Sequence, residues 1–331
     1  MSNPTTAVAP ARDPALSGFA IVLGSAALFG MLGPLSRFAY DAGMEPTAFV
    51  AWRAGIGLVA LALFVAWGVR RGRMNLIRLV DLSIGDRVAL LVAGLMGFTL
   101  NLAMFIAFDR ITIALALLAF YTYPAMVAVV SVALGRERLD GTRLLALALA
   151  IVGMTAVVAS QIDPATGIRF DVIGVALALG AALSQTVYVV VSRDGYRAVP
   201  AEQAIAVVLA VSTLGAVLIA VVTGAGASIT YPLGAPGVLP LLLFTGIVTA
   251  AIPSLGFLTG IRAIGGTRAG ILMLFEPVVG VALAAWLLSE ALVPIQAVGA
   301  VAILAAALLL QRSRAAIDDD ATRAPVVPVG P

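Results

Sequence analysis

The sequence predicts an all-α polytopic membrane protein in which ten transmembrane helices form a 5+5 inverted-topology repeat. Three observations predict this fold: an apolar composition, ten apolar runs of membrane-spanning length, and a proline–glutamate spacing that occurs once in each half. The 331 residues are 62% hydrophobic and 11% charged, and their mean hydropathy is +1.10. Because soluble domains carry about 25% charged residues, this composition indicates an integral membrane protein.

The chain contains neither cysteine nor histidine, and all 20 basic residues are arginine. Disulfides, thiolate or imidazole metal sites, and catalysis by Cys or His are therefore excluded. No enzymatic activity, cofactor or metal is expected. An intramembrane protease or acyltransferase is disfavoured because no convergent carboxylate pair replaces the missing residue types.

Ten apolar runs approach the length of about 20 residues that crosses a bilayer. They are 17–36, 47–69, 88–108, 111–134, 142–160, 172–192, 201–223, 237–261, 266–288 and 294–311. The first run is too long for the apolar part of a signal peptide, and no clear cleavage motif follows it. We therefore expect it to be the first span of the protein.

The runs divide the chain into four parts. Residues 1–16 are expected to form a disordered cytoplasmic N-terminus, and residues 312–331 a disordered cytoplasmic tail that contains three consecutive aspartates. Between them, residues 17–161 form the first five-helix repeat, and residues 162–311 form the second.

The arginines predict the orientation, because cytoplasmic loops collect basic residues. With the N-terminus in the cytoplasm, the outer loops hold Arg37, Arg110 and Arg169, and Arg53 lies inside a span. The other sixteen lie in cytoplasmic segments: Arg12, Arg70, Arg71, Arg73, Arg78, Arg87, Arg136, Arg138, Arg143, Arg193, Arg197, Arg262, Arg268, Arg312, Arg314 and Arg323. The pI of 9.7 is thus a sign of topology and not of nucleic-acid binding. We expect a multi-pass protein of the bacterial inner membrane, with both termini in the cytoplasm and no required oligomer.

A proline lies near the middle of the fourth run and of the ninth. Pro124 is followed 13 residues later by Glu137, and Pro277 is followed at the same distance by Glu290. A proline inside a helix removes one backbone hydrogen bond and bends the helix. In a membrane, such breaks persist only where they are buried in protein or line a cavity. Broken helices at matching places in two halves indicate a transporter binding site.

The halves align elsewhere as well. The proline–glutamate match has an offset of 153 residues; an offset of 156 pairs Ala20 with Ala176, Gly24 with Gly180, Ser36-Arg37 with Ser192-Arg193, and Tyr40 with Tyr196. Because five spans is an odd number, the second copy must cross the membrane in the opposite orientation, with the substrate site near the midplane between the halves. We expect the Ala-xxx-Gly pairs to let the first helix of each half approach its neighbours closely.

The ten spans, the inverted repeat and the Pro-x12-Glu-x-Leu pattern together resemble the EamA-type members of the drug/metabolite transporter superfamily. The resemblance covers residues 17–311. It implies one EamA domain per half and export of amino acids or related metabolites, and the sequence looks closest to the YddG-type exporters of aromatic and other neutral amino acids. The first half departs from the second, since it has Tyr123 where the second has Glu276.

Polar residues in the middle of spans are the candidate substrate-binding residues. Asn101 on the third span and Ser254 on the eighth correspond under the 153-residue offset. An amide in hydrocarbon needs a hydrogen-bond partner, on another helix or on the substrate. On the sixth span, Gln185 and Tyr188 share a helix face, and Tyr188 either contacts the substrate or packs in the core.

The residues before the two prolines form the second group of candidates. Tyr121 and Tyr123 precede Pro124, and Glu276 precedes Pro277. The carbonyl groups that the prolines leave free can bind an ammonium group faced by the tyrosines, or they can bind water or a neighbouring hydroxyl.

Two charged residues lie within spans. Glu276, about 15 Å deep at 1.5 Å per residue, either carries a proton or fixes the bend through a hydrogen bond. Arg53 is closer to the end of its span and is expected to extend its side chain to the membrane surface. Glu137 and Glu290, at span ends, are expected to bond loop amides or arginines.

We therefore expect a carrier that exports amino acids, chiefly aromatic and neutral ones, or related small metabolites by alternating access, with Pro124 and Pro277 as hinges. The alternative is an exporter of cationic or lipophilic drugs that uses Glu276 as a counter-charge. A carrier of sugar phosphates or nucleotide sugars is less favoured, because phosphates require several buried basic residues and the spans hold only Arg53.

Overall fold

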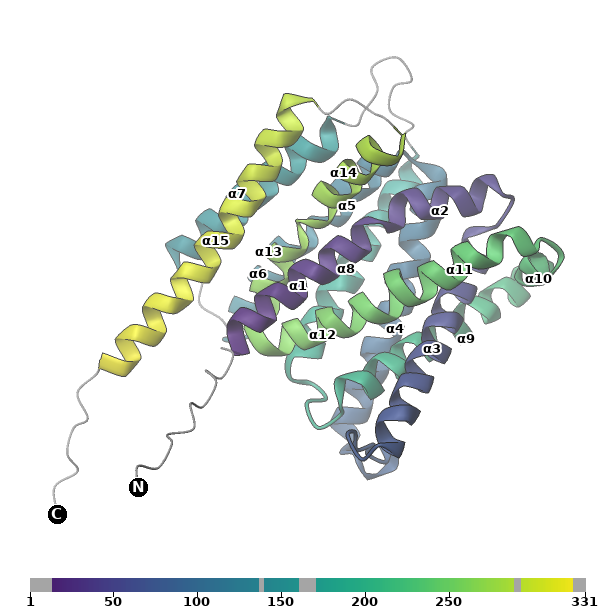
Figure 1. Ribbon diagram of the computed structural model, residues 1–331, viewed down its shortest axis with the longest axis horizontal. Helices are drawn as coiled ribbons and strands as arrows, with labels where there is room; N and C mark the ends of the chain where they lie inside the picture. Colours follow the sequence, from purple (N-terminus) through teal and green to yellow (C-terminus); the bar gives the residue numbers. More distant parts are fainter. Residues whose placement is uncertain (1–13, 137–139, 161–170, 289–292, 324–331) are drawn as a thin grey trace, which may run out of the picture.

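The computed structural model describes residues 14–136, 140–160, 171–288 and 293–323, and all regular structure in these ranges is helical (Figure 1). The first half contains α1 (Pro14–Gly30), α2 (Leu32–Asp41), α3 (Pro46–Arg70), η1 (Leu79–Asp81), α4 (Ile84–Arg110), α5 (Ile113–Phe120), α6 (Tyr123–Ala133) and α7 (Gly141–Ala159). The second contains α8 (Val172–Asp194), α9 (Ala201–Val222), α10 (Gly226–Gly234), η2 (Pro236–Val238), α11 (Leu239–Gly246), η3 (Ile247–Ala251), α12 (Ile252–Ile264), α13 (Gly266–Met273), α14 (Glu276–Leu288) and α15 (Pro294–Arg323).

Eight helical segments in the described ranges are long and apolar enough to cross a membrane. They are Leu16–Asp41, Pro46–Arg70, Ile84–Arg110, Leu115–Ala133, Gly141–Ala159, Val172–Asp194, Ala201–Val222 and Pro236–Ile264, and they coincide with the first eight expected runs. The ninth run is divided between α13 and α14. The tenth contains a shorter apolar helix, Pro294–Leu310.

The fourth and ninth runs are broken at the same place. Two residues separate α5 from α6, and two separate α13 from α14. In each case the new helix begins one residue before the proline, at Tyr123 and at Glu276. Proline is tolerated in the first turn of a helix, where its missing N–H costs nothing, but it cannot continue the preceding helix. The breaks therefore follow from Pro124 and Pro277.

Helices of the two halves pack against each other in matching pairs. α4 of the first half packs against α8, the first helix of the second half. Equivalently, α12 of the second half packs against α1, the first helix of the first half. α3 packs against α9, and α7 packs against α15. Glycines permit the α7–α15 contact, since a Cβ added to Gly153 would lie 2.6 Å from the Gly299 carbonyl oxygen. Contacts between the halves thus hold the bundle together.

Two expectations are wrong. A Cβ added to Gly24 or Gly180 would meet no atom within 4 Å, so these glycines do not serve close helix packing; their faces of α1 and α8 point away from neighbours. The helix α15 runs on to Arg323, through residues expected to be disordered, because the apolar run is followed by the good helix formers of Gln311–Ile317. Glu137 and Glu290 lie outside the described residues.

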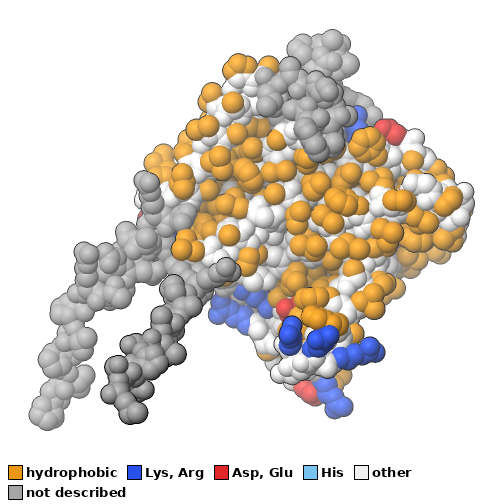
Figure 2. All heavy atoms as spheres, in the orientation of Figure 1, with side chains coloured by type: hydrophobic (Ala, Val, Ile, Leu, Met, Phe, Trp, Pro, Cys, Tyr) orange, Lys and Arg blue, Asp and Glu red, His pale blue; other side chains and the backbone are white. Residues whose placement is uncertain are grey.

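The surface of the bundle is largely apolar. Figure 2 shows hydrophobic side chains spread over one face, with most of the basic side chains in view gathered at one end. Large aliphatic side chains are well exposed along several helices, for example Leu63 at 67% and Leu214 at 70%. Exposed side chains of this kind on a long apolar helix are expected to face lipid.

Candidate functional site

Arg53 lies on α3 and is buried, with 5% of its surface exposed. Its Nη1 donates to Oδ1 of Asn101 on α4 at 2.9 Å, and its Nη2 donates to the backbone carbonyl of Thr249 in η3. The guanidinium also lies 5.7 Å from the centroid of the Phe105 ring. The expectation that Arg53 extends to the membrane surface is therefore wrong, because acceptors on α4 and η3 hold it inside the protein.

The Thr249 carbonyl is available to Arg53 because Pro253 follows four residues later. In a regular helix the N–H of residue 253 would donate to this carbonyl, but proline has no N–H. The chain adopts a π-helical turn here, Ile247–Ala251, and such turns often occur at functional sites. The π-helical turn was not predicted from the sequence, although Pro253, well inside the eighth run, was a visible signal.

Asn101 holds Arg53 in a fixed orientation. Its Nδ2 donates to the carbonyl of Gly97, one turn earlier on α4, at 2.8 Å. The amide oxygen is thereby directed toward the guanidinium. The amide of Asn101 was expected to bond either to another helix or to the substrate. In the structure its partner is Arg53, on helix α3.

Glu276 is the first residue of α14 and is partly exposed. The free N–H groups and the dipole of a helix N-terminus favour a carboxylate at this position. Glu276 interacts electrostatically with Arg53 on α3 and with Tyr121 and Tyr123 at the other helix break. A Cβ added to Gly30 would lie 2.5 Å from the Glu276 carbonyl oxygen, so glycine at this position lets α1 approach the break.

Two tyrosines, Tyr121 and Tyr123, lie beside Glu276, and Phe120 packs against both of them. The ring centroids of Phe120 and Tyr123 are 5.2 Å apart, and those of Tyr121 and Tyr123 are 6.5 Å apart. Both tyrosines are 1% exposed. Gly270 on α13 packs directly against Tyr123, with its ideal Cβ position 3.5 Å from the ring. The two broken helices therefore meet at this aromatic group.

Several buried polar atoms in this region have no hydrogen-bond partner of ordinary geometry among the described residues. They are Nε of Arg53, Oη of Tyr40, Tyr121 and Tyr123, and Oε1 of Gln185. Tyr40 still lies close enough to Ser36, Tyr121 to Glu276, and Tyr123 to Gln185 for each pair to interact. Because buried polar groups are nearly always paired, this concentration of unpaired atoms points to a ligand or to ordered water.

We call Arg53, Asn101, Tyr121, Tyr123, Gln185 and Glu276 the central polar cluster. It combines side chains from α3, α4 and α8 with the two helix breaks. Five of the seven expected substrate-binding residues belong to it. Arg53 was not among those seven, because its position in the sequence suggested a surface location.

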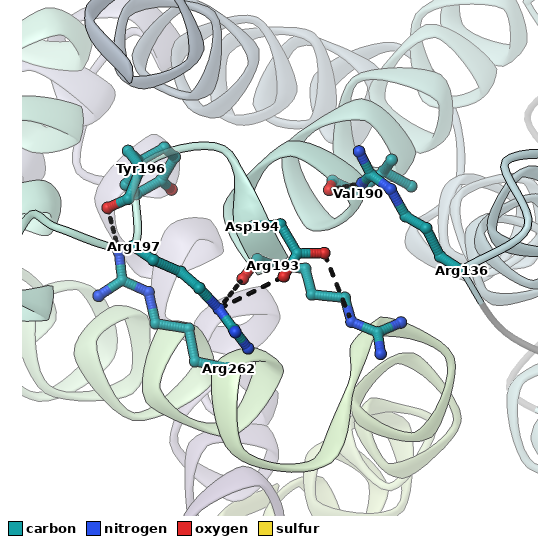
Figure 3. A network of polar contacts seen from close by, with 7 residues as sticks. All are labelled: Arg136, Val190, Arg193, Asp194, Tyr196, Arg197 and Arg262. Atoms are coloured by element: carbon teal, nitrogen blue, oxygen red, sulfur yellow. Dashed lines mark hydrogen bonds and ion pairs between the residues drawn. The ribbon is translucent and has the colours of Figure 1, made fainter. Parts of the chain in front are cut away.

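Two of the expected residues lie elsewhere. Tyr188 is buried one turn beyond Gln185 and interacts with Ser192, Tyr196 and Arg262 near the end of α8; Figure 3 shows the surroundings of Tyr196 and Arg262. Ser254 is partly buried on α12, next to Pro253. No contact among the described residues joins it to the central polar cluster.

The chain is similar to known proteins along most of its length. A model of the EamA-like transporter family matches residues 16–159 and again residues 172–312. A solved structure, described only as "Crystal structure of protein", has a TM-score of 0.71 and 21% sequence identity, over 91% of this chain and 96% of that one. No curated protein sequence matches.

The twofold match agrees with the two halves described above, each of which carries one broken helix. At 21% identity the solved structure supports the fold alone. The family match supports small-molecule transport by a multi-pass membrane protein, and it gives no sign of enzymatic activity. With two EamA domains that together span most of its length, the chain belongs to the EamA-like transporter family.

Proposed function

We propose that this transporter exports neutral amino acids, aromatic ones included, from the bacterial cytoplasm across the inner membrane. One observation carries the proposal: the buried Arg53 and the partly exposed Glu276 bring opposite charges together, among buried polar atoms that have no hydrogen-bond partner of ordinary geometry in the described residues. The YddG-type exporters are the corresponding group within the family.

The chemistry of a zwitterion matches this arrangement. A guanidinium binds a carboxylate with paired hydrogen bonds, and the free Nε of Arg53 is one donor available for this. The carboxylate of Glu276 and the faces of Tyr121 and Tyr123 suit an ammonium group. Because the two protein charges balance, a substrate with two balanced charges leaves no net charge buried in the membrane.

An inverted 5+5 repeat of ten transmembrane helices gives this site its central position. The breaks at Pro124 and Pro277, offset by 153 residues, and the exchange of α4–α8 with α1–α12 support the repeat. The ninth and tenth spans are then α13–α14 and the first part of α15. Transporters with inverted repeats bind substrate between the halves and expose it alternately to either side.

The distribution of arginine supports a cytoplasmic location for both termini. With that orientation, sixteen of the 20 arginines face the cytoplasm. Substrate then reaches the central polar cluster from the side at which α8 and α12 end.

Export of cationic or lipophilic drugs is the alternative. It requires Glu276 to act as an unopposed counter-charge, and the proximity of Arg53 argues against this. A carrier of sugar phosphates is also disfavoured, because the cluster contains a single basic residue.

Uptake of a labelled amino-acid panel into proteoliposomes tests the proposal. Neutral amino acids should be transported faster than cationic or anionic ones, and Glu276→Gln should lower kcat/KM for them about 30-fold, as expected for loss of a charge-assisted hydrogen bond. Arg71→Gln, a surface change at the end of α3, is the matched control and should have no effect. Transport of cationic drugs but not of amino acids, abolished by Glu276→Gln, would establish the alternative. An imposed proton gradient in the same assay distinguishes coupled export from facilitated diffusion.

A further inference from the structure

The segment from the last residue of α3 to the first turn of α4 carries five arginines. They are Arg70, Arg71, Arg73, Arg78 and Arg87, and all five are exposed. None of them forms an ion pair or a side-chain hydrogen bond with another described residue. We call residues 70–87 the α3–α4 segment. Its acidic residues are Asp81 and Asp86, so the segment carries an excess of unpaired positive charge.

Other arginines near this segment have acceptors within the protein. The end of α8 lies beside the start of α4, where a Cβ added to Gly195 would be 2.8 Å from that of Ala89. Arg136 donates to a backbone carbonyl of α8 at 2.8 Å, and Arg197 lies 3.3 Å from the carboxylate of Asp194 (Figure 3). Basic residues collect at the cytoplasmic side of membrane proteins in general, so charge alone indicates no ligand. The α3–α4 segment differs from its surroundings because its charges have no acceptor among the described residues.

Two of the five arginines lie over one exposed indole ring. The guanidinium groups of Arg71 and Arg73 are 5.4 and 5.7 Å from the centroid of the Trp67 ring, and Trp67 is 46% exposed. Gly72, between them, has a φ of +66°, which permits the turn that ends α3. A guanidinium that stacks on a ring keeps the N–H groups at its edge free. The two groups can therefore bind a phosphate together while the indole holds them in place.

Contacts with the rest of the protein fix the shape of the α3–α4 segment. Gln203 on α9 accepts a hydrogen bond from the N–H of Ile77 at 3.1 Å and donates to the carbonyl of the same residue at 2.8 Å. A Cβ added to Gly68 would lie 2.5 Å from the sulfur of Met74, so this side chain packs on the end of α3. A surface ordered in advance loses less entropy when it binds a ligand.

Large apolar side chains of the α3–α4 segment are exposed among the arginines. Leu76, Val80 and Ile84 are each more than half exposed. The segment joins two membrane-spanning helices, so it lies at the membrane surface. There, apolar side chains enter the acyl region while arginines remain at the level of the headgroups. Figure 2 shows the same combination, with basic side chains at one end of a largely apolar face.

We propose that the α3–α4 segment binds an anionic phospholipid, whose headgroup phosphate lies on the guanidinium groups of Arg71 and Arg73. Its acyl chains contact Leu76, Val80 and Ile84. Charge complementarity identifies this occupant, because the phosphate supplies the acceptor that the arginines lack. The exposed apolar side chains favour a lipid over a free phosphate ion or an acidic protein. In the proposed orientation the segment faces the cytoplasmic leaflet, whose anionic lipids attract basic segments.

The lipid site is separate from the central polar cluster. Trp67 follows Arg53 by 14 residues on α3, a distance of about 21 Å along a helix. The lipid therefore does not touch the transported substrate, and the inference does not depend on which substrate that is.

Quenching of tryptophan fluorescence by brominated lipids tests the proposal, because bromine on an acyl chain quenches an indole that it contacts. The protein is reconstituted in phosphatidylcholine, and brominated phosphatidylglycerol or brominated phosphatidylcholine is added in equal amounts. The chain has three tryptophans, so the signal of Trp67 is the difference between the wild type and Trp67→Phe. We expect stronger quenching by the phosphatidylglycerol. The ratio of the two apparent binding constants measures the preference for the anionic headgroup.

Two double variants remove the same charge from different places. Arg73→Gln should lower the ratio about fivefold, the contribution of one basic residue near an anionic surface, and Arg73→Gln/Arg78→Gln should lower it further. The matched control is Arg136→Gln/Arg197→Gln, in which both arginines have acceptors in the protein. It should leave the ratio unchanged. Quenching by brominated phosphatidylcholine should be the same in all these proteins, which reports on folding and insertion.

Three results would overturn the proposal. Equal quenching of the wild type by the two lipids would mean that the segment recognises no headgroup and is open to another partner, such as an acidic protein. An equal loss in the control variant would mean that the general charge of this end is responsible. Loss of the preference in millimolar inorganic phosphate would indicate a site for a soluble anion. The assay needs no substrate, so a failure to transport amino acids leaves its result intact.

Discussion

The two helix breaks share their geometry and differ in their chemistry. Both have a two-residue interruption followed by a helix with proline as its second residue. The residue before proline is Tyr123 in the first half and Glu276 in the second. The backbone arrangement is thus duplicated, while the carboxylate is present at one break only.

The difference shows how a repeated scaffold acquires a polar site. The first half supplies the positive charge through Arg53, which lies on α3 and not at the break. The equivalent position in the second half, 153 residues later, is the uncharged Ala206. The second half supplies the negative charge at its break. Each half therefore contributes one member of the charge pair, and an asymmetric substrate such as a zwitterion has one preferred orientation between them.

Removing Arg53 should have the largest effect. Arg53→Leu leaves Asn101 Oδ1 and the Thr249 carbonyl without their donor, and it leaves Glu276 without a neighbouring positive charge. Breaking a buried charge network in this way costs about 3 kcal/mol or more. We expect a lower unfolding midpoint in detergent and, in the folded fraction, at least a hundredfold loss of amino-acid transport. Arg71→Leu, whose guanidinium lies over the exposed Trp67 ring, is the control. A stable and fully active Arg53→Leu protein would contradict the assigned role.

The prolines should have the next largest effect. Pro124→Ala or Pro277→Ala restores an N–H that can continue the preceding helix, so turnover should fall about tenfold while the protein remains folded. Pro277→Ala should be the slower of the two, because it also moves Glu276. Initial rates in proteoliposomes measure this, with size-exclusion profiles for folding. Pro46→Ala is the matched control, since Pro46 occupies the first position of α3, where no hydrogen bond is lost. Unchanged turnover in both hinge variants would exclude hinges at the breaks.

The sequence predicted the breaks well, because the cause is local. The missing N–H of Pro124 and Pro277 interrupts a helix wherever the helix lies in the protein. The first eight spans were predictable for a similar reason, since the length and hydropathy of a run determine whether it can cross a bilayer.

The surroundings of Arg53 were not predictable from the sequence. Its partners Asn101 and Thr249 are 48 and 196 residues away along the chain, and only the packing of α3 against α4 and η3 brings them together. The same limit explains the error at Gly24 and Gly180. A small-residue pattern shows that a helix can be approached closely, but it does not show which face has a neighbour.

Removing a tyrosine hydroxyl should have a smaller effect, and stability and transport should change in opposite directions. Tyr121→Phe or Tyr123→Phe deletes a buried hydroxyl that makes no hydrogen bond of ordinary geometry within the described residues, so the free energy of unfolding should rise by up to about 1 kcal/mol. If the hydroxyl binds substrate, transport should fall about fivefold. Tyr231→Phe is the control: its hydroxyl donates to the Ala42 carbonyl, so stability should fall while transport is unchanged. A loss of stability in the Tyr121 and Tyr123 variants would show that their hydroxyls are paired within the protein.

The contact between the halves at Asp171 should give the smallest effect. Asp171, just before α8, accepts a hydrogen bond from Arg110 at the end of α4 at 2.8 Å, and this partner lowers the pKa of the carboxyl below its ordinary value of 3.8. A carboxyl group with a lowered pKa stabilises the folded state above its ordinary pKa, and this contribution is lost as the pH falls through the lowered value. Asp171→Asn keeps an acceptor for the N–H groups of Ile173 and Gly174 but removes the charge. Its unfolding midpoint should therefore be slightly below that of the wild type at neutral pH, and the difference should shrink on acidification below pH 3.8. A difference that persists in acid would show that the charge of Asp171 is not its cause, and Asp171→Ala, which loses the helix cap as well, measures the contribution of the cap.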